Sequence, residues 1–156
     1  MELILWRHAD AEAGEPYGLP DLERQLTPLG RRQAEHVAGW LNVRLPEHCR
    51  ILCSPAVRAQ QTVDTLERDY EVEAALGPGA SPQEVLRAVG WPQRGGAVLL
   101  AGHQPTLGRL AALLLCGRAQ DLDIPRGAAW WFDQPDPHDS YTLTLKAVVT
   151  PDLTLK

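Results

Sequence analysis

The sequence lacks the features of several specialised classes of protein. Its longest apolar runs, such as Leu110–Cys116, are far shorter than the roughly 20 residues of a membrane-spanning helix. Positive charge is also scarce, because 15 Lys and Arg residues stand against 20 Asp and Glu residues, which gives a formal net charge of −5. Binding to nucleic-acid phosphates requires a basic surface. We therefore expect neither a membrane nor a nucleic acid as partner, and any anion site must be local.

Cysteine and targeting signals are also sparse. The residues Cys49, Cys53 and Cys116 are an odd number at spacings that fit neither a disulfide framework nor a zinc site, so we expect buried structural thiols. The N-terminus lacks the basic stretch and cleavage site of a secretory signal, and it leads from Met1 directly into a strand-like segment. These absences predict a cytoplasmic protein.

Short apolar runs alternate with segments of helical periodicity, and the length of 156 residues predicts one domain over 1–156. The expected central strands are 3–6, 51–53 and 97–101. Apolar faces mark expected helices at 34–41, 59–66, 85–89 and 107–114. Alternating residues over 141–149 predict an antiparallel edge strand near the C-terminus, paired with 128–132. The sequence thus predicts an α/β three-layer sandwich, with a mostly parallel central sheet flanked by helices.

Proline marks the start of each expected helix. It suits the first helical position, whose N–H would lack a partner in any case. The four pairs are Thr27-Pro28, Ser54-Pro55, Ser81-Pro82 and Gln104-Pro105. Ser81 and Glu84 also match the pattern of a capping box. We therefore expect each helix to begin at its proline.

The ends of the expected strands carry the residues best suited to chemistry. In open α/β sheets, ligands bind beyond the carboxyl ends of the strands. The first strand leads into Arg7 and His8, and the second leads to Arg58 on the first turn of a helix. The strand at 97–101 leads into His103. Helix N-termini at the same edge would add free N–H groups, so we expect an anion pocket there.

Arginines and histidines in one pocket favour a phosphoryl group as the ligand. Each guanidinium can form paired, charge-assisted hydrogen bonds with phosphoryl oxygens. Surrounding cations lower the pKa of a histidine, so its ring stays neutral and keeps a lone pair. A neutral imidazole can accept the phosphoryl group covalently and pass it to water, while the other groups stabilise charge on the oxygens. The pattern therefore indicates phosphoryl transfer.

Four segments, in chain order, resemble the signatures of a known family. They are Leu5-Trp6-Arg7-His8, Leu26-Thr27-Pro28-Leu29-Gly30, Ser54-Pro55-Ala56-Val57-Arg58-Ala59-Gln60-Gln61-Thr62 and Gly102-His103-Gln104-Pro105. The family is the histidine phosphatase superfamily, with a phosphoglycerate-mutase-like fold. The short chain, the segment Arg24-Gln25-Leu26-Thr27 and the Gly-His-Gln-Pro motif most resemble the SixA-type phosphohistidine phosphatases of that family.

The resemblance implies a role for each residue of the expected pocket. His8 would be the phosphorylated nucleophile, Arg7 and Arg58 would bind the phosphoryl oxygens, and His103 would complete the pocket. We expect no cofactor and no metal ion, because His8 and His103 lie among arginines and have no carboxylates at ligand spacing.

One position departs from the family's pattern. Many relatives have Leu-x-Glu after the third strand, where the glutamate is the general acid, whereas this chain reads Leu76-Gly77-Pro78. Phosphohistidine leaves as imidazole, which needs less protonation than the alkoxide of a serine or sugar phosphate. The departure therefore favours phosphohistidine on a protein as the substrate, or Asp10 or Glu12 as a substitute proton donor.

Two other functions fit the same residues. One is a broad phosphomonoesterase for small molecules such as sugar phosphates or nucleotides. The other is a noncatalytic, phosphate-binding regulatory module that lost turnover with its acid. The stretch 74–81 is too short to close over a small ligand, which favours an open pocket and a phosphorylated protein as partner. The long, acidic segment 9–25 is expected to be a lid or a disordered excursion.

Overall fold

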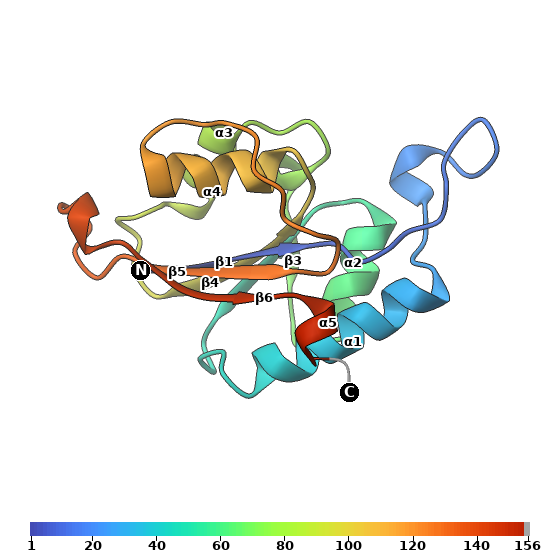
Figure 1. The fold of residues 1–156 in the computed structure, drawn as a ribbon, viewed down its shortest axis with the longest axis horizontal. Coiled ribbons are helices and arrows are strands. Elements are labelled where there is room, and N and C mark those ends of the chain that lie inside the picture. The colour runs from blue at the N-terminus through green and yellow to red at the C-terminus, as the bar shows by residue number, and fades with distance from the viewer. Residues whose placement is uncertain (155–156) are drawn as a thin grey trace.

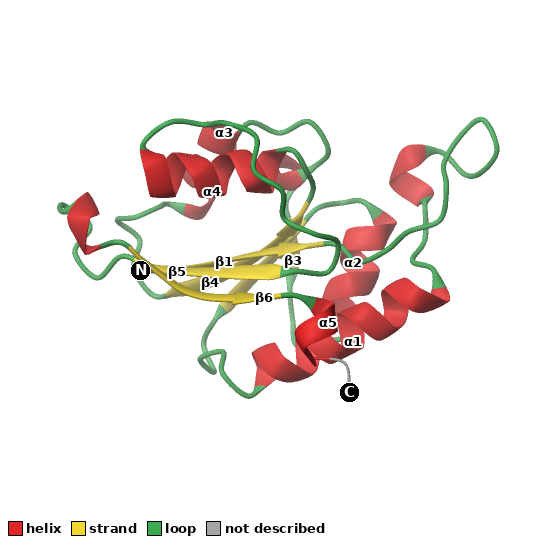
Figure 2. Ribbon diagram, in the orientation of Figure 1, coloured by secondary structure: helices red, strands yellow, loops and turns green. Residues whose placement is uncertain are grey.

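In the computed structural model, which describes residues 1–154, a six-stranded sheet lies between two layers of helices (Figures 1 and 2). The strands are β1 (Glu2–Arg7), β2 (Arg50–Cys53), β3 (Glu71–Val72), β4 (Ala97–Gly102), β5 (Ala129–Asp133) and β6 (Thr144–Val149). The α-helices are α1 (Pro28–Asn42), α2 (Val57–Asp64), α3 (Pro82–Val89), α4 (Thr106–Cys116) and α5 (Pro151–Thr154). No helix in this part of the chain has the length and hydrophobicity of a membrane span.

The strand order of the sheet is β3-β2-β4-β1-β5-β6. Neighbours from β3 to β1 pair in parallel, as expected for strands that are joined by helical crossovers. β5 pairs antiparallel with both β1 and β6, so β6 forms the antiparallel edge expected near the C-terminus. The predicted α/β sandwich with a mostly parallel central sheet is therefore confirmed.

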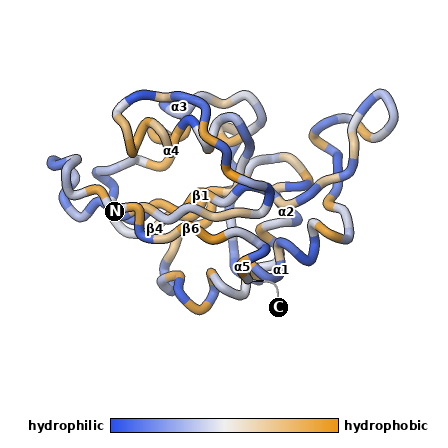
Figure 3. Tube along the Cα trace, in the orientation of Figure 1, coloured by the Kyte–Doolittle hydropathy of each residue, from blue (hydrophilic) through white to orange (hydrophobic). Residues whose placement is uncertain are grey.

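Strand β1 is buried on both faces because its side chains alternate between them. Ile4 and Trp6 belong to a cluster that includes residues of α1 and α2, whereas Leu3 and Leu5 belong to a cluster with residues of α3 and α4. Figure 3 shows the hydrophobic residues gathered along the sheet and α4. With both faces covered, the carboxyl ends of the parallel strands are the part of the sheet open to ligands.

Two helices begin where proline predicts. Pro28 opens α1 directly after its cap Thr27. Pro82 opens α3 after a capping box in which Ser81 and Glu84 bond to each other's amides. These caps satisfy amides that would otherwise lack partners, which fixes the starting residue of each helix.

The other two helices begin later than predicted. α2 begins at Val57 rather than Pro55, because Ser54 Oγ accepts the amide of Ala56 and forms a turn ahead of the helix. α4 begins one residue after Pro105. Both turns follow a strand of the parallel sheet, at the edge where ligands are expected.

The edge strand is shorter than predicted. β6 begins at Thr144, whereas Tyr141 is 98% exposed in a 3₁₀ helix, η3 (Ser140–Thr142). Asp139 causes this early turn, because its carboxylate accepts the amide of Tyr141 and its carbonyl accepts the hydroxyl of Thr142. Local side-chain bonds here outweigh the alternating pattern.

The expectation of buried thiols is wrong for one cysteine. Cys53 is buried and Cys49 is half-buried, but Cys116 is exposed. Cys116 is the last residue of α4, and the last buried position of that helix is Ala112. The end of the helix therefore extends beyond the core and leaves this thiol in solvent.

Candidate active site

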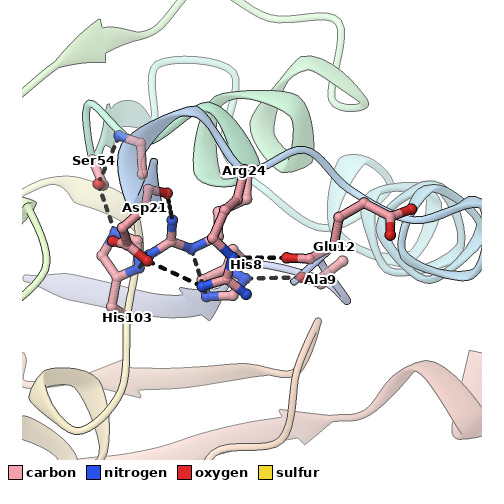
Figure 4. A network of polar contacts seen from close by, with 9 residues as sticks. His8, Ala9, Glu12, Asp21, Arg24, Ser54 and His103 are labelled. Atoms are coloured by element: carbon pink, nitrogen blue, oxygen red, sulfur yellow. Dashed lines mark hydrogen bonds and ion pairs between the residues drawn. The ribbon is translucent and has the colours of Figure 1, made fainter. Parts of the chain in front are cut away.

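Three strand ends meet at one edge of the sheet. β1 and β4 are parallel neighbours, and they lead directly into His8 and His103. β2 lies on the other side of β4 and leads into Ser54 and then α2, whose second residue is Arg58. Figure 4 shows His8, Ser54 and His103 in one polar network. The topology thus brings together residues that are far apart in the sequence.

His8 presents one ring nitrogen to this network. The ring is buried, and its Nδ1 lies 2.8 Å from the carbonyl oxygen of Ala9. A carbonyl can only accept, so Nδ1 carries the proton and Nε2 keeps the lone pair. The Nε of Arg58 donates to Nε2 at 3.3 Å. Burial, assisted by the charges of Arg58 and Arg7, lowers the pKa of His8 to about 4, so the ring is neutral at pH 7.

His103 is held by Ser54 and Arg58. Its Nε2 lies 2.7 Å from Ser54 Oγ, and its Nδ1 lies 3.3 Å from Nη2 of Arg58. A guanidinium can only donate, so Nδ1 accepts and Nε2 donates to the hydroxyl. Burial, followed by the nearby His8 and Arg58, lowers the pKa of His103 to about 3. The candidate site therefore holds two neutral imidazoles whose ring centroids are 5.2 Å apart.

Arg58 connects both histidines to the β1–α1 loop (residues 9–25). Its side chain is 5% exposed. Nη1 donates to the carbonyl of Asp21 at 2.7 Å, and Nη2 lies 3.3 Å from the Asp21 carboxylate. Burial lowers the pKa of Arg58, and the charge of Asp21 opposes that shift. A cation at a helix N-terminus faces the positive end of the helix dipole, so Asp21 supplies the anion that this position favours.

Arg7 lies at the same edge with a free donor. Its Nη1 donates to the carbonyl of Ile124 at 2.9 Å, and the Asp123 carboxylate is 4.0 Å away. Burial lowers the pKa of Arg7. Its Nε is buried and has no hydrogen-bond partner among residues 1–154. Buried donors in folded proteins are rarely left unpaired, so this N–H is a candidate donor for a ligand.

The face of α2 that carries Arg58 also fixes the two ends of the β1–α1 loop. Thr62 donates to the carbonyl of Arg58 and accepts the amide of Ala9 at 3.1 Å. Gln61 accepts the amide of Leu26 at 2.8 Å. Positions i, i+3 and i+4 share one helix face, so Gln61 and Thr62 lie on the same face as Arg58. They hold the backbone on either side of the loop next to Arg58.

The two expected proton donors do not contact the histidines. The carboxylate of Asp10 accepts from Nη1 of Arg126 at 2.8 Å and from the hydroxyl of Thr27 at 2.7 Å. Glu12 is exposed, and its side chain points away from His8 in Figure 4. Neither carboxylate is therefore in position to reach the pocket in this conformation.

The β1–α1 loop contributes residues that the sequence reasoning missed. Asp21 contacts Arg58 from η1 (Asp21–Glu23), a 3₁₀ helix within the loop. Arg24 donates to the Asp21 carboxylate at 3.1 Å and to the carbonyl of Glu12 at 2.7 Å. The loop, expected to be a lid or a disordered excursion, is held by these bonds and lies against Arg58. The sequence signal for the contact between Asp21 and Arg58 is an acidic residue in a long polar loop that follows a strand at the carboxyl edge of the sheet.

Ser54 is a third residue whose contact the sequence reasoning missed. The sequence reasoning treats it as a helix start, but its hydroxyl accepts the amide of Ala56 and bonds the ring of His103. Its position at the end of β2, next to β4, is the signal that predicts this contact.

The arrangement suits a tetrahedral oxyanion. Arg7 and Arg58 supply positive charge, and Arg7 supplies a buried, unpaired donor. Among the described residues, no three His, Cys, Asp or Glu side chains form a group that could hold a metal ion. A neutral ring nitrogen at His8 lies beside these cations.

Comparisons with known proteins point to one family. The family model of the histidine phosphatase superfamily (branch 1) matches residues 3–79. An uncharacterized protein of Mycobacterium tuberculosis is 37% identical over 113 residues, which cover 69% of this chain and 68% of that protein. A phosphohistidine phosphatase SixA homolog of Haemophilus influenzae is 29% identical over 133 residues, which cover 73% of this chain and 77% of that protein.

A solved structure extends the similarity to nearly the whole chain. The structure of the protein histidine phosphatase SixA complexed with tungstate matches with a TM-score of 0.80 and 25% sequence identity, covering 98% of this chain and 99% of that one. The resemblance carried by the four sequence motifs is therefore confirmed. The chain belongs to the histidine phosphatase superfamily and is a phosphatase of the SixA type.

Proposed function

We propose that the protein hydrolyses phosphohistidine on another protein, through a covalent phosphohistidine at His8. The observation that carries this proposal is the state of the His8 ring. Its Nδ1–H bonds to the carbonyl of Ala9, so the lone pair lies on Nε2 near His103, where it accepts the Nε–H of Arg58 until the substrate displaces that contact. With a pKa of about 4, the ring is unprotonated at pH 7 and can attack phosphorus.

The reaction has two displacements at phosphorus. In the first, the lone pair of His8 Nε2 forms a bond to phosphorus while the bond to the substrate imidazole breaks. The substrate ring, which carries a proton on its other nitrogen, leaves with the electron pair of the broken bond as neutral imidazole. In the second, water forms a bond to phosphorus, the bond to Nε2 breaks, and the proton of the water passes to solvent as phosphate leaves. Arg7 and Arg58 bind the phosphoryl oxygens in both steps, with His103 beside them, and stabilise their charge.

The lack of the family's glutamate, together with the positions of Asp10 and Glu12, supports phosphohistidine as the substrate class. Pro78 stands where many relatives have a glutamate, Asp10 is bound to Arg126 and Thr27, and Glu12 points away from the pocket. Imidazole is a much weaker base than an alkoxide, so it leaves without a strong proton donor. A phosphoserine or a sugar phosphate depends more on such a donor.

Two similar proteins support the same class of substrate and ligand. The Haemophilus influenzae protein is named as a phosphohistidine phosphatase SixA homolog, and the SixA structure is a complex with tungstate, a tetrahedral oxyanion like phosphate. We infer that Arg7 and Arg58 of this chain bind such an anion between them. The partner is then a protein that carries phosphohistidine. The cytoplasmic location of the phosphatase itself stays a prediction from the sequence.

A comparison of substrates tests the proposal. Phosphate release is measured with a histidine-phosphorylated protein, a phosphoserine peptide and a sugar phosphate, and the His8→Ala variant is the blank for each. We expect the highest kcat/KM for phosphohistidine. An aryl phosphate, whose leaving group needs little protonation, should also turn over, in a reaction that vanadate inhibits and a chelator leaves unchanged.

Other outcomes would reject parts of the proposal. A higher kcat/KM for the sugar phosphate or the phosphoserine peptide would reject phosphohistidine as the preferred substrate. Loss of activity on adding a chelator would reject the metal-free mechanism. Binding of phosphate without turnover of any substrate would contradict catalysis through His8.

A further inference from the structure

Asp21 occupies donors of Arg58 that a phosphoryl group needs, one through its carboxylate and one through its backbone carbonyl. A guanidinium has five N–H groups. Within residues 1–154, those of Arg58 make four contacts: Nε with His8, Nη2 with His103 and with the Asp21 carboxylate, and Nη1 with the backbone carbonyl of Asp21, which leaves one N–H free. Paired binding of a phosphoryl group takes two neighbouring N–H groups. Arg58 therefore cannot bind a phosphoryl group in this way until the Asp21 side chain moves.

We propose that Asp21 competes with the substrate for Arg58 and thereby sets the affinity of the pocket for oxyanions. In the resting protein its carboxylate is bound to Arg58, and an arriving phosphoryl group displaces it. Asp21 can compete only if Arg58 binds the phosphoryl group, so this role rests on the proposed function.

Asp21 is held in a way that allows displacement. Its side chain is 56% exposed, whereas the side chain of Arg58 is 5% exposed. The η1 helix that carries Asp21 has no buried residue. When the carboxylate leaves Arg58 it is hydrated again, while Arg58 remains between His8 and His103. The Asp21 carboxylate can therefore be displaced by the phosphoryl group, because water replaces the contact that the exposed carboxylate loses.

Arg24 and Arg58 both favour the ionised form of Asp21. Desolvation would raise the pKa of Asp21, but the hydrogen bonds and charges of Arg24 and Arg58 lower it below its ordinary value. Asp21 is therefore an anion at neutral pH in the resting protein, which suits competition with another anion.

The same competition affects both ends of the catalytic cycle. On entry, the substrate must displace the carboxylate, which raises KM. After hydrolysis, inorganic phosphate is bound by the same Arg58, and the return of Asp21 helps to release it. Removing the charge of Asp21 should therefore tighten the binding of substrate-like anions and of the product.

Calorimetric titration of the full chain with tungstate tests this role without turnover. Asp21→Asn keeps the size of the side chain and removes its charge. We expect a Kd about tenfold lower than that of the wild type, which corresponds to 1.4 kcal/mol. Glu23→Gln is the matched control, because Glu23 lies on the same η1 helix and is exposed. Its Kd should stay within about twofold of the wild type.

Arg58→Ala separates this role from the proposed function. One outcome is that Arg58→Ala weakens tungstate binding while Asp21→Asn leaves it unchanged or weaker. That result would support Arg58 as an oxyanion ligand and reject Asp21 as its competitor. Equal tightening by Asp21→Asn and Glu23→Gln would also overturn the role, since it would show only a general effect of charge. If Arg58→Ala leaves the Kd for tungstate unchanged, Arg58 does not bind the oxyanion. That result would reject both the proposed phosphoryl site and the role of Asp21. Arg58→Lys, which keeps the charge but loses the fork, replaces the alanine variant if that one does not fold.

Discussion

The pocket is made by two regions that differ in how firmly they are held. His8 and His103 directly follow strands whose apolar side chains are buried, and both rings are buried themselves. Asp21 and Arg24 come from the β1–α1 loop, where η1 buries no residue and Asp21 is mostly exposed. In the proposed mechanism the strand ends hold the reacting groups, whereas the loop supplies Asp21, whose side chain is mostly exposed.

This difference assigns separate tasks to the two regions. Groups that stabilise charge during phosphoryl transfer are most effective when they are already oriented before the substrate arrives. Groups that control entry and release must move on each turnover. Changes at the strand ends should therefore affect kcat strongly, and changes in the loop should mainly affect binding.

The largest effect is expected at His8. His8→Ala removes the nitrogen that accepts the phosphoryl group, so kcat should fall by roughly 10⁴ to 10⁶, as for the loss of other catalytic nucleophiles. Turnover of an aryl phosphate measures this fall. His36→Ala, at an exposed position of α1, is the control and should keep full activity. Substantial activity in His8→Ala would contradict the covalent mechanism.

The next largest effect is expected at Arg58. Arg58→Ala should raise the transition-state barrier by about 3–4 kcal/mol, comparable to the loss of an oxyanion donor. Arg58→Lys should restore little of this, because a lysine lacks the planar fork. Steady-state kcat/KM checks both variants, with the exposed Arg31→Ala on α1 as the control. Equal rates for Arg58→Ala and the control would show that the strand-end region works without Arg58.

The pH dependence of the two rings tests their burial. An ordinary histidine takes up a proton near pH 6.5, whereas His8 and His103 should do so near 4 and 3. Nitrogen NMR of the labelled rings checks this directly. The unfolded chain binds these protons at higher pH than the folded chain, so the free energy of unfolding should fall as the pH drops from about 6.5 to about 3. Titration of His8 near 6.5 would show that its ring is more hydrated than the structure indicates.

The smallest effect is expected at Glu12, in the loop. Its side chain is exposed and points away from His8, so Glu12→Gln should change kcat/KM by less than about twofold. Comparing phosphoserine with an aryl phosphate sharpens the test, because a lost proton donor would slow only the substrate with the poor leaving group. A selective loss of phosphoserine turnover would identify Glu12 as a proton donor after loop movement.

The same two regions explain what the sequence predicts and what it does not. Apolar runs predict the central strands, and parallel topology then brings the residues after them to one edge, which is why His8, Arg58 and His103 could be grouped. No comparable rule exists for an irregular loop. The contact of Asp21 with Arg58 depends on the path of the whole loop and on the bonds of Arg24, and periodicity encodes neither.

Local side-chain bonds account for other differences. Ser54 delays the start of α2, and Asp139 delays the start of β6, because each bonds a nearby amide in place of regular structure. The sequence alone does not predict these bonds, because a short polar side chain can bond several different backbone groups.

The most direct test of the account is the identity of the phosphorylated atom. The enzyme is mixed with a slowly hydrolysed phosphoramidate, quenched in alkali to preserve phosphohistidine, and analysed by mass spectrometry and phosphorus NMR. Because Nδ1 of His8 is bonded to the Ala9 carbonyl, we predict a single phosphoryl group on Nε2 of His8. A phosphoryl group on Nδ1 or on another residue, or turnover without any phosphoenzyme, would contradict the account.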